Sequence, residues 1–155
     1  SYQYRMLEFR LGNKNRQMAR VFESHSDIAR QVQAALPAPR LYAAALALLA
    51  RRGFPVPEEK LIRDFSESYT SDPRVTEVWR LVYQDVEKHW DLYELAEKLV
   101  DLEYRFHLWR FSHMKTVERI IGSKPGTGGT SGVPYLQKAL SLRFYPELWD
   151  VRTEI

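Results

Sequence analysis

The stretch DLYELAEKLVDLEYRFHLWRFSHMKTVERIIG, residues 91–122, carries the longest apolar periodicity in the chain and decides the fold. Apolar residues recur along it every three or four positions, which is the period of a helix that packs one face on a core. Asp91 and Glu94 resemble a capping box at its start, and Gly122 is typical of a helix end. We therefore predict a helix over about 91–121, roughly 45 Å long. Its expected core-facing stripe is Leu95, Leu99, Leu102, Phe106, Trp109, His113, Val117 and Ile120.

Shorter helical patterns fill the rest of the chain, separated by glycine and proline. Ser71, Asp72 and Pro73 predict a helix start, because capping residues precede a proline at the first helical position. That helix is expected to reach about His89. No strand alternation and no repeat stands out, so we expect an all-α fold with one domain over residues 1–155. The other expected helices cover about 4–11, 27–36, 40–52, 58–65, 134–142 and 146–152.

Composition excludes several classes of protein. The chain has 155 residues, of which 45% are hydrophobic, which is enough for one sizeable core. It has no cysteine, which removes disulfides and thiolate metal sites and fits a reducing compartment, so we expect a cytoplasmic protein. The longest apolar run, residues 41–50, is too short for a membrane helix, and we expect no membrane partner.

The charge pattern leaves a second class of function open. The net charge is +3 and the pI is about 9.2, and Arg51 and Arg52 are adjacent. A helical interaction module or nucleic-acid-binding module without enzymatic activity is therefore the alternative to an enzyme. Its signal is weak, because 23 basic and 20 acidic residues are interspersed and form no basic patch. We expect no nucleic-acid partner.

His113 lies within the apolar stripe of the long helix, and two interpretations of it stay open. A lone histidine in such a stripe is often a core residue satisfied by a hydrogen bond. Alternatively, a neutral imidazole on a rigid helix with apolar neighbours suits an axial ligand of haem iron. Nearby cations could then pair with the haem propionates, as guanidinium groups do with carboxylates. The cations in question are Arg105, Arg110, Lys115 and Arg119; His25, His89 and His107 are weaker candidates for a ligand.

The segment GSKPGTGGTSG, residues 122–132, holds five of the seven glycines in the chain. It differs from a nucleotide-binding P-loop, because no lysine follows its last glycine and it comes after a helix instead of a strand. A plain connector and a loop that orders around a small polar ligand remain as alternatives. In the second case Thr127, set among glycines, is the hydroxyl expected to point at the ligand.

Taken together, these motifs resemble one known family. The histidine, then V-x-R-x-I-G, then K-x-GTGG-T-SG and a Y-L helix are similar to the C-terminal catalytic segment of tryptophan 2,3-dioxygenases. QYRMLEFRLGNKN near the start and FYPELWDVRT near the end resemble the same family. The resemblance spans essentially the whole chain and is weakest over residues 24–72. His113 stands fourteen residues before Thr127, which makes the GTGG match more specific.

The resemblance implies an all-helical, homotetrameric enzyme of tryptophan catabolism that binds haem b. Such an enzyme adds O2 across the C2–C3 bond of the indole of L-tryptophan and gives N-formylkynurenine, the first product of the kynurenine pathway. His113 would be the proximal iron ligand. Thr127 would contact the ammonium and carboxylate end of the substrate, and the glycines would let the loop close as a lid. Some relatives of this family act on modified indoles or carry out other haem oxidations.

The family also has a distal histidine and an aromatic-x-x-x-Arg pair for the substrate carboxylate, which precede the position of Ser1. The chain therefore carries half of the expected active site, and we expect the N-terminal part of the same enzyme in front of Ser1 as its partner. Arg5 follows the family's carboxylate arginine in sequence and does not take its role.

Overall fold

The fold is all-α, as the sequence predicts. The computed structural model describes residues 2–14, 16–20, 26–122, 124 and 132–155, and within these ranges it contains helices, turns and no strand. The helices are α1 (Tyr2–Leu11), α2 (Arg16–Arg20), α3 (Ser26–Ala35), α4 (Leu41–Arg51), α5 (Glu58–Leu61), α6 (Pro73–Gln84), α7 (Trp90–Ile121), α8 (Val133–Leu140), α9 (Pro146–Asp150) and the 3-10 turn η1 (Val151–Thr153).

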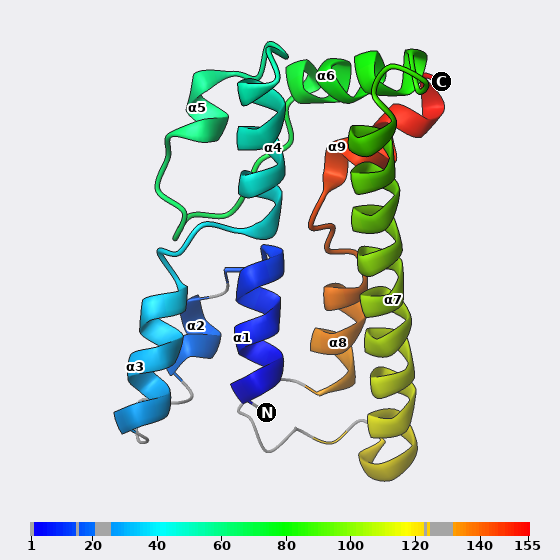
Figure 1. Ribbon diagram of the computed structural model, residues 1–155. Coiled ribbons are helices and arrows are strands. Elements are labelled where there is room, and N and C mark those ends of the chain that lie inside the picture. Colours follow the sequence, from blue (N-terminus) through cyan, green and yellow to red (C-terminus); the bar gives the residue numbers. More distant parts are fainter. Residues whose placement is uncertain (1, 15, 21–25, 123, 125–131) are drawn as a thin grey trace.

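The long helix α7 runs along one whole side of the molecule (Figure 1). Its 32 residues confirm the helix predicted over about 91–121. The predicted capping box at its start is wrong, because His89 occupies the N-cap without a side-chain cap. The two acidic residues serve other partners: Asp91 accepts from Arg52 at 2.5 Å, and Glu94 accepts from Lys98 at 3.0 Å. At the other end, Gly122 takes a φ of +58°, which only glycine adopts readily, and donates its N–H to Glu118.

The start predicted for α6 is confirmed. The Asp72 carboxylate accepts the backbone N–H of Arg74 at 2.9 Å, and Pro73 occupies the first turn. The helix ends at Gln84 and so is shorter than expected, and a turn leads to α7. In Figure 1, α6 crosses one end of α7, while α4 and α1 follow one another along its inner side and α3 packs on the outer side of α1.

Two clusters of buried side chains hold these helices together. The larger joins α4, α6, α7 and α9 around Trp79, Tyr42 and Tyr145. The smaller joins α1, α2 and α3 around Phe9 and Val32. Because α1 contributes Leu11 to the first cluster and Phe9 to the second, it links the two halves of the structure.

The predicted core-facing stripe of α7 is only partly correct. Leu99 and Phe106 are buried, but Trp109 is 46% exposed, Ile120 is 74% exposed and His113 is also exposed. The pattern of apolar residues did not identify the buried face of α7, because two of the residues on that face are charged. Their partners lie on helices that are distant in the sequence. The buried residues of α7 are Leu92, Ala96, Leu99, Val100, Glu103, Phe106, Arg110 and Met114.

Glu103 fixes the turn between α8 and α9 against α7. Its buried carboxylate accepts the backbone N–H groups of Phe144 and Tyr145, the latter at 3.2 Å, and the indole N–H of Trp149 at 2.7 Å. One carboxylate therefore satisfies three donors that would otherwise be buried without an acceptor. This contact places α8 alongside α7, where it forms one wall of the pocket described next.

Candidate functional site

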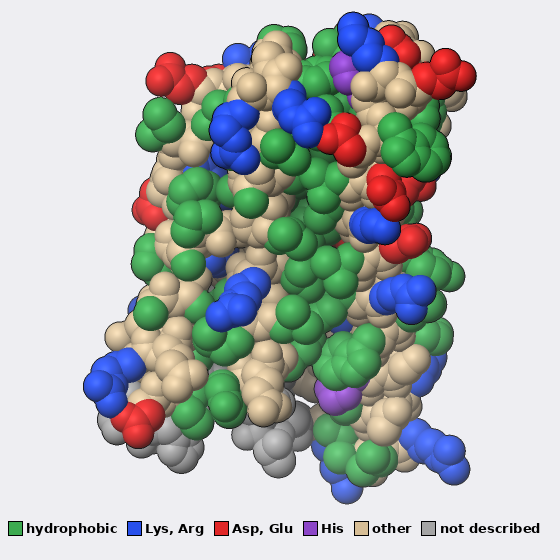
Figure 2. All heavy atoms as spheres, viewed as in Figure 1, with side chains coloured by type: hydrophobic (Ala, Val, Ile, Leu, Met, Phe, Trp, Pro, Cys, Tyr) green, Lys and Arg blue, Asp and Glu red, His purple; other side chains and the backbone are tan. Residues whose placement is uncertain are grey.

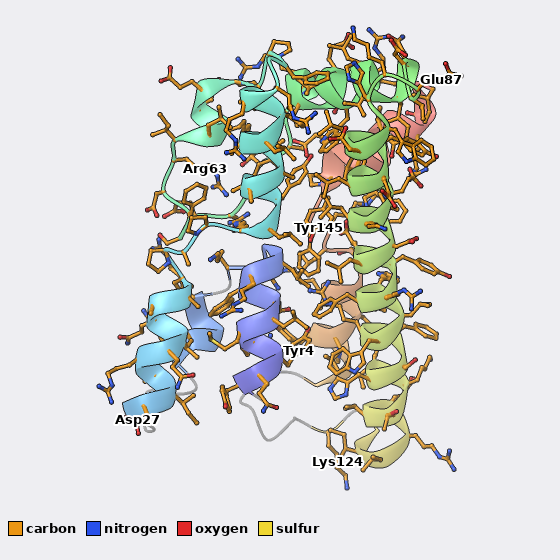
Figure 3. All side chains as sticks on the ribbon, in the orientation of Figure 1. Tyr4, Asp27, Arg63, Glu87, Lys124 and Tyr145 are labelled. Atoms are coloured by element: carbon orange, nitrogen blue, oxygen red, sulfur yellow. The ribbon has the colours of Figure 1, made fainter. Side chains whose placement is uncertain are left out.

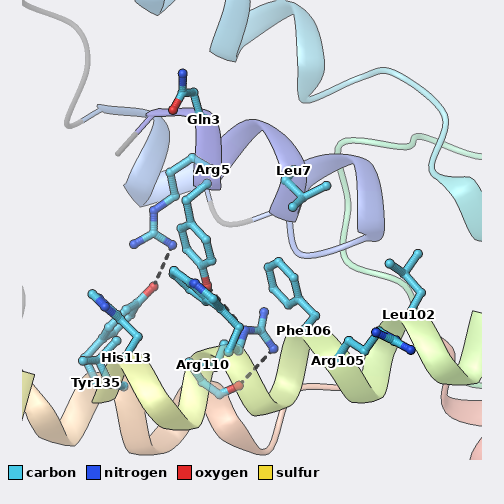
Figure 4. A pocket seen from close by; sticks show the side chains of 13 residues that line it. Gln3, Arg5, Leu7, Leu102, Arg105, Phe106, Arg110, His113 and Tyr135 are labelled. Atoms are coloured by element: carbon cyan, nitrogen blue, oxygen red, sulfur yellow. Dashed lines mark hydrogen bonds between the residues drawn. The ribbon is translucent and has the colours of Figure 1, made fainter. Parts of the chain in front are cut away.

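The largest pocket of the described residues lies between α1, α7 and α8 and has a volume of about 630 Å³. Hydrophobic side chains gather on the molecular surface between α1 and α7 (Figure 2). Apolar and aromatic groups dominate the pocket wall, and the charged groups in it are all arginines. The lining residues, most of them labelled in Figure 4, are Gln3, Tyr4, Arg5, Leu7, Leu102, Arg105, Phe106, Trp109, Arg110, His113, Tyr135, Leu136 and Ala139.

His113 lies in this pocket at the end of a stack of aromatic rings. Its ring lies 5.0 Å from that of Trp109, at an interplanar angle of 9°. The Trp109 ring in turn lies 4.8 Å from Tyr4, and Tyr4 stacks on Phe106 at 5.6 Å. The imidazole is exposed and makes no hydrogen bond to any described residue, so the interpretation of His113 as a satisfied core histidine is wrong. The stack orients the ring and leaves its nitrogens available.

A buried ion pair holds α1 on α7 directly behind the pocket wall. Arg110 donates to the Glu8 carboxylate at 3.1 Å and to the carbonyl of Ala139 at 3.2 Å. Glu8 and Arg110 are 1% and 4% exposed, and such a pair is stable only when its remaining hydrogen bonds are also satisfied. Glu8 meets that condition, because it also accepts from Arg5 at 2.6 Å and from Asn13 at 2.8 Å.

Tyr4 is fixed by the same ion pair. Its hydroxyl donates to Glu8 at 3.1 Å and receives a long contact of 3.4 Å from Arg110. Burial, reinforced by the Glu8 carboxylate, raises the pKa of Tyr4 to about 12, so the phenol stays neutral. Figure 3 shows Tyr4 projecting from α1 toward α7. The position of this ring, and with it the stack that reaches His113, therefore depends on Glu8 and Arg110.

The arginines named from the sequence have different surroundings. Arg110 is committed to Glu8 and Ala139, so it is not available to a cofactor carboxylate. Arg105 lines the pocket, is exposed, and pairs with no carboxylate among the described residues. Lys115 pairs with Glu118 at 2.8 Å on the surface, and Arg119 is exposed outside the pocket lining.

Sequence reasoning missed Arg5 and Tyr135 as members of the pocket. The Arg5 guanidinium reaches the Tyr135 hydroxyl at 3.5 Å while it pairs with Glu8 (Figure 4). Burial lowers the pKa of Arg5, but the nearby Glu8 carboxylate opposes this effect. The pKa is raised overall, so the Arg5 guanidinium stays protonated. No local signal could reveal this, because α1 and α8 meet only through the folded packing on α7.

The glycine-rich segment begins and ends within the described structure. Gly122 ends α7 and Gly132 precedes α8, both with positive φ, of +58° and +64°. Thr127 lies outside the described residues, so its expected role as a substrate ligand stays a prediction. The α8 end of the segment leads directly into Tyr135 and Leu136 of the pocket wall.

The two other histidines that the structure describes, His89 and His107, form no second candidate site. His89 packs edge-on against Phe54 at 5.1 Å, His107 lines a different hollow beside Trp149, and His25 lies outside the described residues. No group of three or more His, Cys, Asp or Glu side chains among the described residues could hold a metal ion. In the same part of the chain, no helix is both long and apolar enough to cross a membrane.

Comparisons with known proteins agree with the resemblance in the sequence. A family model described as tryptophan 2,3-dioxygenase matches residues 58–155. Curated proteins named tryptophan 2,3-dioxygenase are 54% identical in Polaromonas sp., 55% in Burkholderia cenocepacia and 54% in Serratia proteamaculans, each over all 155 residues. The match covers 53%, 50% and 55% of those relatives, so the chain spans about half of their length. The chain belongs to the tryptophan 2,3-dioxygenase family.

Proposed function

We propose that residues 1–155 form the C-terminal catalytic segment of a haem-dependent dioxygenase that adds O2 across the C2–C3 bond of the indole of L-tryptophan. The product would be N-formylkynurenine, in the kynurenine pathway. The observation that carries this proposal is His113, an exposed imidazole stacked on Trp109 in a pocket walled by aromatic rings, in a chain of this family. The rest of the enzyme would supply the opposite wall of the active site.

The residues of the pocket fit haem b. Its volume of about 630 Å³ lies within the range of roughly 300–1,000 Å³ that is typical of cofactor sites. Tyr4, Phe106 and Trp109 offer apolar surface to a porphyrin, and His113 offers an imidazole to its iron. Arg105 is the cation of the pocket suited to a propionate, because Arg5 and Arg110 are already paired with Glu8.

Haem, when bound, supplies the oxygen chemistry, and the protein supplies binding, orientation and exclusion of water. The Trp109 ring limits rotation of the His113 imidazole, and the Glu8–Arg110 pair keeps Tyr4 against Trp109. Thr127 is proposed to bind the ammonium and carboxylate end of tryptophan from the glycine-rich segment. Closure of that segment would exclude water from the indole and fix its orientation.

We also propose that the enzyme is a cytoplasmic homotetramer, in which the N-terminal part of the same enzyme packs on this chain. Large apolar side chains exposed on α7 support an extensive interface, since soluble proteins rarely leave many of them together in water. They include Trp90, Tyr104, Leu108 and Phe111, each at least 45% exposed. The alternative of a nucleic-acid-binding module gains no support, because many exposed arginines of the described residues pair with carboxylates.

The test is haem content of the full-length enzyme after His113→Ala, compared with His107→Ala. Both histidines are exposed on α7, but only His113 lines the pocket. We expect His113→Ala to lose most of the Soret absorbance and the tryptophan oxidation, and His107→Ala to keep both. Equal haem content in the two variants would show that the ligand is a different residue.

A further inference from the structure

A second, smaller cavity lies on another part of the molecule, between the end of α1, the segment that follows α5, and the turn between α8 and α9. Its volume is about 100 Å³. Water occupies roughly 30 Å³ per molecule in the liquid, so the cavity has room for about three waters or one small ion. We name it the arginine pocket, and the residues on which the argument rests are Gly12, Asn13, Arg40, Ser68, Tyr69 and Arg143.

Arg40 is the buried charge of the arginine pocket. Its side chain is 3% exposed, one terminal nitrogen donates to the carbonyl of Glu67, and its Nε has no hydrogen-bond partner. The side chain lies over Gly12, where a Cβ atom would come within 3.6 Å of the Arg40 Cδ and 3.9 Å of a terminal nitrogen. Gly12 has a φ of +133°, so the backbone there also favours glycine. The molecule therefore brings a buried guanidinium to a small cavity and leaves one donor unsatisfied, which is costly without a ligand.

The charged groups around Arg40 are mainly cations. Burial, reinforced by Arg63 and opposed by Tyr69, lowers the pKa of Arg40 to about 10. Burial likewise lowers the pKa of Lys14 to about 8, with Arg40 and Arg63 adding to the effect. The Lys14 ammonium donates to the carbonyls of Ala35 and Ala38, at 2.6 and 2.9 Å.

No carboxylate among the described residues forms an ion pair with Lys14, Arg40 or Arg63. Burial lowers the pKa of Arg63, and Tyr69 and, more weakly, Asp64 oppose the shift; Asp64 itself is exposed and accepts from Ser66. Arg63, which follows α5 in Figure 3, is covered by the rings of Phe65 and Tyr69, at 5.2 and 5.4 Å. The buried Lys14 and Arg40 thus lack the carboxylate partner that Glu8 supplies to Arg110.

We propose that the arginine pocket binds a small oxyanion of the size of phosphate or sulfate. The Arg40 guanidinium would be the buried donor, and the Ser68 hydroxyl a second donor from the segment after α5. Arg143, at the rim, holds Asp150 only at 3.7 Å, so its guanidinium is free to turn to the anion. A bound oxyanion would neutralise Arg40 and join three segments of the chain, which stabilises the folded state by mass action.

The test is calorimetric titration of the full-length enzyme with inorganic phosphate and with sulfate, at constant ionic strength set with sodium chloride. We expect saturable binding with one site per chain, and a rise in the melting temperature that follows the same saturation. Arg143→Gln removes the rim charge without disturbing the core, because Arg143 is exposed, and should weaken binding about tenfold. Arg51→Gln, which removes an exposed arginine at the end of α4, is the matched control and should leave binding unchanged.

Arg40→Lys tests the buried donor, because it keeps the positive charge and removes the Nε hydrogen; circular dichroism shows whether the variant folds. Absence of saturable binding to the unmodified enzyme would overturn the proposal, and so would equal weakening by Arg143→Gln and Arg51→Gln. Because the readout is anion binding, the outcome is independent of the proposed oxygenase activity.

Discussion

The two halves of α7, residues 90–105 and 106–121, differ in how far the rest of the chain covers them. The first half packs into the main core through Leu92, Ala96 and Leu99, and its buried Glu103 receives three donors from the α8–α9 turn. The second half contacts α1 and α8 and leaves Trp109 and Ile120 exposed. Most of the buried apolar residues of α7 therefore lie in its first half, whereas its second half supplies most of the α7 residues that line the pocket.

The largest effect is expected where the two halves meet, at the Glu8–Arg110 pair. Glu8→Ala leaves the Arg110 guanidinium buried without its carboxylate, so we expect a loss of about 3–5 kcal/mol in the free energy of unfolding. Urea denaturation of the haem-free enzyme measures it. Glu118→Ala is the matched control, because Glu118 pairs with Lys115 on the surface of α7 and should contribute little. Equal effects would mean that the buried pair does not hold α1 on α7.

A pair of substitutions within α7 tests the comparison directly. Leu99→Ala opens a cavity in the first half and should cost about 2–5 kcal/mol of stability, with little direct effect on haem affinity. Trp109→Ala removes a half-exposed ring in the second half and should cost less stability, but it should weaken haem binding because the support of His113 is lost. Urea denaturation and haem titration of both variants measure the two effects. The comparison fails if Trp109→Ala destabilises the haem-free enzyme as much as Leu99→Ala.

The buried carboxyl group of Glu147 makes the stability of the folded chain depend on pH. Glu8 is paired with arginines, but Glu147, beside the first half of α7, accepts only from Tyr42 at 3.1 Å, Tyr69 at 2.7 Å and the Asp72 N–H at 2.9 Å. Burial raises the pKa of Glu147 above its usual 4.5, although these hydrogen bonds oppose the shift. The folded state therefore holds this proton more tightly than the unfolded chain does.

The stability contributed by protonated Glu147 is complete below the unfolded pKa and is lost as the pH rises through the folded pKa. We expect the stability of Glu147→Gln relative to the unmodified enzyme to increase as the pH rises above about 4.5, with a slope of at most about 1.4 kcal/mol per pH unit. Urea denaturation across that range measures the slope, with Glu154→Gln as an exposed control. A slope of zero would mean that burial does not perturb this carboxyl group.

Much of this architecture can be predicted from the sequence, but not the faces of its helices. The period of residues 91–122 and the Asp72–Pro73 signal are local, and both helices occur, although α6 ends earlier than expected. The buried face of α7 could not be predicted, because Glu103 and Arg110 are buried only through partners on α1, α8 and α9. His113 could be named from its motif, because that motif is local in the sequence. Arg5 and Tyr135 could not be placed beside it, because α1 and α8 reach the pocket only through their packing on α7.

The smallest expected effect concerns Arg105, the exposed cation at the pocket. If it pairs with a haem propionate at the surface, solvent screens the interaction, and Arg105→Gln should weaken haem retention only about two- to fivefold. Transfer of haem from the enzyme to apomyoglobin measures the loss. Arg119→Gln removes an exposed arginine from the same half of α7 outside the pocket and should leave transfer unchanged. An equal effect of both variants would indicate a general loss of positive charge and would contradict the pairing of Arg105 with a propionate.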